Sequence, residues 1–178
     1  MKPINMTVLA LAAGAASNAF GTQYLTVEQA QQAMFPDASG FKDASLQLSA
    51  EQMKQVEKLS GLPARSVAWR VFAAYKGDTQ LGYMVLDDVV GKFELISYAV
   101  AVNPDASIKQ IEILTYRESH GFEIKSPAWR KQFVGKTAAA GLAIGDGIAS
   151  ISGATLSCTH VTDGVRRIAA IAQVALKK

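Results

Sequence analysis

FELISYAVAVNPDASIKQIEILTYRE, residues 93–118, decides the fold of this chain. Two runs of β-branched and aromatic residues flank Asn103-Pro104-Asp105, which is a turn signal, so the stretch predicts two neighbouring antiparallel strands. The first run is apolar on both faces, which indicates a central strand that is covered on both sides. In the second run Ile113 and Leu114 interrupt the alternation, which predicts a β-bulge.

Two further strands are predicted upstream of this pair. Residues 66–78, SVAWRVFAAYKGD, end at the turn Gly77-Asp78, and residues 80–92, QLGYMVLDDVVGK, follow. Between Val67 and Tyr116 the sequence therefore predicts an antiparallel meander of about four strands, roughly ten residues each. We expect an α+β fold in which helices pack on this sheet.

Residues 20–66 are predicted to form a helical lead-in to the sheet. Thr26 and Ser49 each stand three residues before a glutamine, which is the pattern of a capping box. The first helix is predicted to stop before Pro36 and the second to end at Gly61. The linker between them, PDASGFKDAS, has the composition of turns.

Helices are also predicted after the sheet. Ser126-Pro127 indicates the start of a short helix on which Trp129 and Phe133 share a face. A long final helix is predicted from about Thr159 to Leu176, and it follows the loop that contains SGAT. Its apolar stripe consists of Val161, Val165, Ile168, Ala172 and Leu176. We expect the sheet and this helix to form one domain, residues 67–178.

Residues 1–19 are typical of a secretory signal peptide. Lys2 supplies an early positive charge, residues 6–16 are apolar, and Ser17-Asn18-Ala19 fits a cleavage site with small residues. An ordinary N-terminal helix is the alternative interpretation, and the apolar run is too short to span a bilayer. We expect cleavage after Ala19 and an exported, periplasmic protein.

The composition argues against several kinds of partner and cofactor. The chain has 178 residues, a formal net charge of +3, and no cluster of Lys and Arg interleaved with aromatic residues, so we expect no nucleic-acid partner. Cys158 is the only cysteine and cannot form an internal disulfide. Because only His120 and His160 accompany it, we expect no metal site of the zinc type.

Ser152-Gly153-Ala154-Thr155, just before the final helix, is the strongest candidate for a binding site. Ser157 or Thr159 is suited to cap the helix and Asp163 to its first turn, but these roles leave the preceding residues unexplained. Glycine permits close approach of a ligand, and a helix N-terminus with free amides binds anions such as phosphate. A phosphate site and a plain cap and turn both stay open on these grounds.

The tetrapeptide SGAT, followed by Leu156 and Ser157, resembles the flavinylation motif of the FMN-binding domain family. That family includes the G subunit of Rnf electron-transport complexes, the C subunit of the sodium-translocating NADH:quinone oxidoreductase, and small exported single-domain members, which this chain resembles most. The resemblance implies that Thr155 carries FMN through a phosphoester bond, made by a flavin transferase that uses FAD and Mg²⁺. The residues that it places around the phosphate or the ring are Ser152, Gly153, Ala154 and Leu156.

A second stretch supports the resemblance, which covers roughly Gly82 to Leu176. Glu118-Ser119-His120-Gly121 is similar in order to an E-T-P-G-like turn of the family, and WRKQFVGK follows at a suitable interval. One position departs from the family pattern. Ala149 stands six residues before the threonine, where family members usually have aspartate.

The resemblance also implies roles around the flavin ring. Glu118 and His120 are expected to hydrogen-bond the ring edge, and Trp129 or Phe133 to pack on the ring. Each residue has an alternative interpretation from its type alone. Glu118 is equally suited to pair with Arg117 or a lysine, His120 to be an exposed turn residue, and the two aromatic residues to belong to the core.

These patterns predict an exported electron-transfer flavoprotein with covalent FMN on Thr155. We expect an electron carrier rather than an enzyme, with redox proteins as partners, membrane-bound ones included. Two alternatives come from other classes of protein. One is a flavin-dependent reductase of a small or metal substrate, and the other is a non-redox binding module that uses the SGAT loop as a helix cap.

Overall fold

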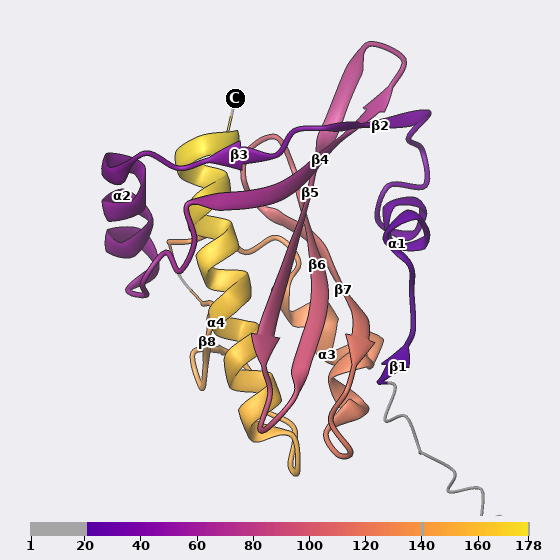
Figure 1. Cartoon of the computed structure of the whole chain (residues 1–178), viewed down its shortest axis with the longest axis vertical. Coiled ribbons are helices and arrows are strands. Elements are labelled where there is room, and N and C mark those ends of the chain that lie inside the picture. The colour runs from indigo at the N-terminus through magenta and orange to yellow at the C-terminus, as the bar shows by residue number, and fades with distance from the viewer. Residues whose placement is uncertain (1–20, 140, 178) are drawn as a thin grey trace, which may run out of the picture.

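The structure, a computed structural model, describes residues 21–139 and 141–177, so the predicted signal peptide lies outside the described residues. Its centre is a seven-stranded antiparallel sheet in the order β1-β7-β6-β5-β4-β2, with β3 also paired to β4. Helices α2 and α4 lie on one side of this sheet and α1 on the other (Figure 1). The predicted α+β class is confirmed.

Four long strands form the predicted meander: β4 (Ala68–Lys76), β5 (Thr79–Val90), β6 (Leu95–Val102) and β7 (Ile108–Tyr116). Strand β6 lies inside the sheet, and its residues 98–102 are all buried, as its two apolar faces predict. Ser97 on β6 pairs with Thr115, whereas Tyr98 pairs with Ile113. Leu114 is therefore the extra residue of the predicted bulge.

Helices α1 (Val27–Met34) and α2 (Ala50–Ser60) begin with the predicted capping boxes. The side chains of Thr26 and Ser49 each accept a hydrogen bond of 3.2 Å from the N–H of the glutamine three residues on. Helix α2 ends at Gly61, whose φ of 67° is the left-handed conformation that glycine adopts readily. Local sequence signals thus define both helices.

The lead-in also contributes three strands that the sequence does not predict: β1 (Thr22–Gln23), β2 (Gly40–Asp43) and β3 (Leu46–Gln47). Strands β2 and β3 pair with β4, and β1 pairs with β7. The two predicted helices of the lead-in are present, but the linker between them forms β2 rather than only turns, and β1 and β3 were not predicted. These strands lie at the edges of the sheet, where short and polar sequences are common, so their composition resembles that of turns.

Shorter elements follow β7: η1 (Phe122–Lys125), α3 (Pro127–Arg130), η2 (Lys131–Phe133), β8 (Ala143–Ile144) and β9 (Gly147–Ile148). Proline occupies the first turn of α3, as predicted. Helix α4 (Thr155–Ile171) continues into a π-helical turn, η3 (Ala172–Leu176). Its start at Thr155 corrects the predicted start at Thr159, because the helix begins after Ala154 without a side-chain cap.

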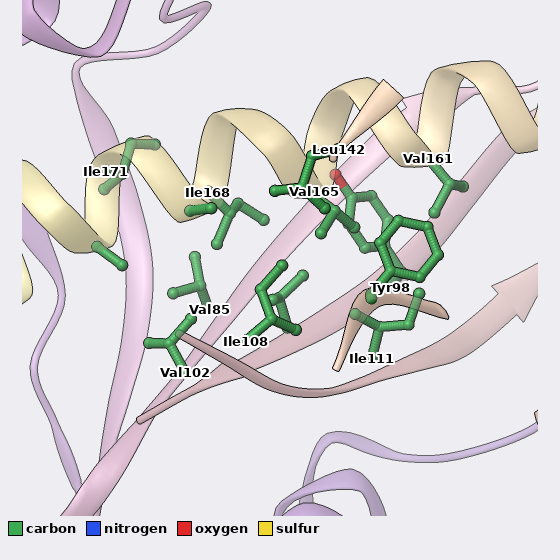
Figure 2. Close-up of a cluster of buried hydrophobic side chains, with 14 of the residues drawn as sticks. Val85, Tyr98, Val102, Ile108, Ile111, Leu142, Val161, Val165, Ile168 and Ile171 are labelled. Atoms are coloured by element: carbon green, nitrogen blue, oxygen red, sulfur yellow. The ribbon is translucent and has the colours of Figure 1, made fainter. Parts of the chain in front are cut away.

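The main core lies between α4 and the sheet. The predicted stripe of α4 is buried, and Val161, Val165 and Ile168 are fully buried against Val85, Tyr98 and Ile108 of the strands (Figure 2). A second, smaller core lies under α1 on the opposite face and contains Met34, Phe35, Met84, Ala99, Ala101 and Leu114. Because both faces of the meander are covered, its loops are held at fixed positions at the ends of the sheet.

Candidate functional site

Three segments that are far apart in sequence meet at one end of the molecule. They are the β5–β6 turn at 91–94, the segment 117–121 after β7, and the loop at 149–154 that leads into α4 (Figure 1). Together they enclose a pocket of about 440 Å³, a volume within the range of ligand sites. Its lining residues are Lys92, Phe93, Glu118, Ser119, His120, Gly153, Ala154, Thr155, Leu156 and Ser157.

The pocket brings together most of the predicted site residues from two separate motifs. Residues 118–120 face residues 153–156 across it. Gly121 lies beside this lining, because a Cβ added there would stand 3.2 Å from the Cβ of Ala154 and 2.6 Å from the Tyr116 hydroxyl. Ser152 is exposed in the same loop but does not line the pocket.

Trp129 and Phe133 lie elsewhere. Their rings are 5.1 Å apart in an edge-to-face arrangement, and both are buried, with exposures of 4% and 0%. The indole N–H of Trp129 donates to the carbonyl of Ala149. The expectation that either residue packs on a flavin ring is corrected by this placement, since both belong to the main core and neither lines the pocket.

Thr155 is the first residue of α4 and is exposed at the pocket. The first N–H groups of a helix have no partner within it, and here no side chain caps them, in contrast to α1 and α2. Unpaired amides and the helix dipole together make this N-terminus electropositive. It is therefore a site suited to a phosphate group.

The neighbouring hydroxyl groups are already engaged. Ser157 is buried, and its Oγ lies 3.0 Å from the hydroxyl of Tyr116, which donates to the carbonyl of His120. The Thr159 hydroxyl donates to the carbonyl of Thr155 at 2.9 Å. The predicted capping roles of Ser157 and Thr159 are therefore wrong, since both hydroxyls lie inside the helix. Within the described residues, the Thr155 hydroxyl has no hydrogen bond.

Asp163 also differs from its predicted place. It lies two turns inside α4 and pairs with Arg166, whose Nη2 is 3.1 Å from its carboxylate. The first turn of α4 contains no acidic residue. No side-chain negative charge of the helix itself therefore opposes an anion at Thr155.

Glu118 holds the β5–β6 turn. Its carboxylate accepts hydrogen bonds from the N–H groups of Phe93, at 2.5 Å, and Glu94, at 2.9 Å. Burial alone raises the pKa of Glu118, but these backbone donors and the nearby Lys92 lower it below its ordinary value overall. Oε1 of this carboxylate is thus engaged by the backbone, and within the described residues no salt bridge joins Glu118 to Arg117 or to a lysine.

His120 is exposed at the pocket, as expected if it is an exposed turn residue. Its Nδ1 lies 2.9 Å from the Ser119 hydroxyl. Gly121 has a φ of 86°, a conformation that favours glycine, and the Tyr116 hydroxyl occupies the space of a side chain there. The Glu118–Gly121 segment is therefore shaped by the Tyr116 hydroxyl, which donates to the backbone carbonyl of His120 and lies against Gly121.

Two lining residues, Lys92 and Phe93, lie outside both motifs that predict the site. The Phe93 side chain is 75% exposed, and the Lys92 ammonium lies 4.9 Å from the centre of its ring. Both residues belong to the β5–β6 turn, and the sequence of that turn contains no motif that sets it apart from other polar turns between strands. Only the pairing of β5 with β6 places that turn opposite the start of α4, so no local signal could have identified it.

Cys158 is fully buried, and burial raises the pKa of its thiol. No cluster of three or more His, Cys, Asp or Glu residues able to hold a metal ion is found in residues 21–139 and 141–177. Within the same ranges, no helix has the length and apolarity that crossing a membrane requires.

The fold and the site define an α+β domain in which a helix N-terminus opens into a pocket that is suited to an anionic ligand. Residues 91–170 match the sequence model of the FMN-binding domain. The fold is similar to the crystal structure of NqrC from Shewanella oneidensis, with a TM-score of 0.50, 17% identity, and coverage of 77% of this chain and 79% of that chain. A search of curated protein sequences finds no match.

These findings confirm the resemblance to the FMN-binding domain family, and every residue that lines the pocket falls within the matched range. The pocket also fits the chemistry of FMN. The uncapped amides of α4 and the Lys92 ammonium suit its phosphate, and the apolar surfaces of Phe93 and Leu156 suit its ring. FMN is therefore the cofactor that the sequence and the pocket both support.

Proposed function

We propose that this protein is an exported electron-transfer flavoprotein that carries FMN through a phosphoester bond on Thr155. One observation carries the proposal. Thr155 presents an exposed hydroxyl without a hydrogen bond at the uncapped start of α4, and it lies in the lining of a pocket within the FMN-binding match. The neighbouring hydroxyls of Ser157 and Thr159 are engaged in other contacts.

Different residues of the chain would bind different parts of the cofactor. The first-turn amides of α4 would bind the phosphate, and Lys92 would offset its charge. Formation of the ester would join the Thr155 oxygen to the FMN phosphorus of FAD while the pyrophosphate bond breaks, which releases AMP and the hydroxyl proton. Bound FMN supplies electron transfer, and the protein supplies orientation and electrostatics.

An electron carrier is favoured over an enzyme by the shape of the site. The pocket is formed by three surface loops, and the residues around it include the exposed apolar side chains Phe93 and Leu156. Such a site is suited to contact with redox partner proteins, membrane-bound ones included. Steady turnover with a small soluble donor and acceptor, and without a partner protein, would instead favour the reductase alternative.

The attachment residue is tested by coexpression with a flavin transferase, followed by intact mass and in-gel fluorescence. Thr155→Ala should carry no covalent FMN, because it removes the oxygen that forms the ester. Thr155→Ser should retain labelling, because it keeps that oxygen. Ser152→Ala is the matched control, since it removes an exposed hydroxyl from the same loop without touching the pocket lining. Covalent FMN on Thr155→Ala would refute the assignment.

Position 149 offers a second variant for the same experiment. Ala149 is exposed, and its hydrogen bonds to Trp129 and Gln132 use only backbone atoms. Ala149→Asp therefore preserves these contacts while it restores the residue that is usual in the family motif. If the wild-type chain is labelled poorly, this variant should be labelled better. An unlabelled Ala149→Asp chain would favour the non-redox alternative, in which the loop only leads into the helix.

Export is the part of the proposal that rests on residues 1–19. Lys2, the apolar residues 6–16 and the small residues 17–19 support removal of this segment after Ala19. N-terminal sequencing of protein recovered from the periplasm should then begin at Phe20. Recovery of the chain with Met1 intact in the cytoplasm would contradict export.

A further inference from the structure

We propose that Phe93 forms the aromatic wall against which the flavin ring lies, and that Glu118 is the residue that positions it. This inference rests on the proposed attachment of FMN at Thr155 and adds the contact that orients the ring. It replaces the expectation that Trp129 or Phe133 packs on the ring. It also gives Glu118 a role that acts through the turn rather than on the flavin.

Phe93 is the aromatic residue that lines the pocket together with Thr155. Its side chain is 75% exposed, so much of its apolar surface is uncovered although the Lys92 ammonium lies 4.9 Å from the ring centre. The buried aromatic rings nearby, Trp129 and Phe133, are occupied by the core and by each other. Aromatic rings favour offset-stacked or edge-to-face contacts, so a flat heteroaromatic ring bound here would cover the Phe93 face.

The turn that carries Phe93 is held from two sides. The Glu118 carboxylate accepts the N–H groups of Phe93 and Glu94. From α4, Nδ1 of His160 lies 2.6 Å from the carbonyl of Val90 and 3.0 Å from that of Gly91, and it donates because carbonyl oxygens only accept. A turn that is anchored in this way presents its side chain in one place without the cost of ordering it on binding.

The close approach of Glu118 to this turn depends on Gly91. A Cβ at position 91 would stand 2.6 Å from Oε1 of Glu118 and 3.1 Å from Cδ1 of Ile96. The carboxylate therefore occupies the space that a side chain would need. Glu118, Gly91 and Phe93 form one local arrangement, in which a charged side chain fixes the backbone and the backbone aims the aromatic ring.

The test compares flavin fluorescence in protein that carries covalent FMN, with the amount of FMN measured by intact mass. An aromatic side chain that stacks on the flavin shields the ring from iodide, and a tyrosine in contact with the ring also quenches its fluorescence by electron transfer, which phenylalanine does not. A contact between two aromatic rings favours the stacked arrangement by roughly two- to tenfold, so Phe93→Leu should raise the iodide quenching constant by a factor of about two or more. Phe93→Tyr keeps the shielding, so its iodide quenching should match the wild type. The same variant should lower the fluorescence yield below that of the wild type, because it places a quencher against the ring.

Variants of Glu118 separate positioning from direct contact. Glu118→Gln keeps an oxygen that can accept from the turn, so its iodide quenching should match the wild type. Glu118→Ala releases the turn and should behave as Phe93→Leu does. Phe122→Leu is the matched control, because Phe122 is 48% exposed on the adjacent segment but does not line the pocket.

Two results would overturn the inference, and they differ from each other. Full labelling of Phe93→Leu with wild-type iodide quenching, and of Phe93→Tyr with wild-type fluorescence, would mean that the ring does not contact residue 93, while attachment at Thr155 still holds. A wild-type chain without covalent FMN by mass, after coexpression with a transferase that labels a known acceptor, would refute the proposed function and this inference together.

Discussion

Tyr98 of β6 packs its ring and hydroxyl group between the sheet and α4. Its ring is fully buried on β6, and its hydroxyl donates to the Asp87 carboxylate at 2.6 Å. Burial, and then the nearby Asp87 charge, raise the pKa of Tyr98 well above its ordinary value, so it stays neutral. The same hydroxyl occupies the space beside Gly164 of α4, where an added Cβ would overlap it. The Tyr98 hydroxyl therefore leaves room only for glycine at position 164 of α4.

Gly164→Ala should therefore destabilise the protein. In an exposed helix interior the same change would stabilise by about 1 kcal/mol, but overlap with a fully packed ring costs roughly 1–3 kcal/mol. Urea unfolding gives the free energy of unfolding of both chains. Gly40→Ala is the control, since a Cβ added at Gly40 meets nothing within 4 Å. An unchanged or higher midpoint for Gly164→Ala would mean that α4 does not pack this closely on Tyr98.

Residue types predicted some positions of the site and could not predict others. The SGAT loop and Glu118–Gly121 were found because their motifs are local in sequence. The place of Phe93 in the site is not predicted by the sequence, because it depends on the pairing of β5 with β6, which the turn itself does not reveal. Ser157 was misread as a cap because its contact is with Tyr116, a residue 41 positions away.

The elements before β4 show where pattern analysis succeeds and fails. The capping boxes of α1 and α2 are complete local signals, so both helices were predicted with their ends. Strands β2 and β3 were missed because their polar, turn-like sequences become strands only by pairing with β4. The start of α4 was placed too late because an uncapped helix gives no signal at its first residue.

A chain that begins at Ser49 should fold poorly, because it lacks α1 and the strands β1, β2 and β3. It loses Met34 and Phe35, which are buried against the outer face of the sheet. Each large apolar side chain contributes roughly 1.5–3 kcal/mol by burial, so these two alone contribute about 3–6 kcal/mol. That amount is comparable to the whole stability of many domains, about 5–15 kcal/mol.

Urea unfolding of this truncated chain should show a much lower midpoint, or no cooperative transition, relative to a chain that begins at Gly21. A chain that begins at Tyr24 is the control, since it lacks only Gly21 and the two residues of β1. An unchanged midpoint for the chain that begins at Ser49 would show that residues 49–178 form a complete folding unit without the earlier elements.

At the scale of the whole molecule, the sequence predicts the class of fold, but it does not predict which three segments come together to form the pocket. The alternation of four strands and the apolar stripe of α4 are enough to define a sheet with a helix on one face. The pocket needs more, because its three segments meet only through the lengths and pairing of β5, β6 and β7. The motifs in two of these segments are visible in the sequence, but their position next to each other and to the β5–β6 turn is set by the sheet.

The edges of the sheet are closed along most of their length. On one side β2 and β3 pair with successive parts of β4. On the other, β7 bonds to β1 and Tyr24 at one end and to Gly135 and Lys136 at the other, and Arg130 donates to the carbonyl of Ile111 between them. An extended segment of another protein would find few free backbone groups for strand addition. Recognition by another protein should therefore use side chains at the loop end of the molecule, where the pocket opens.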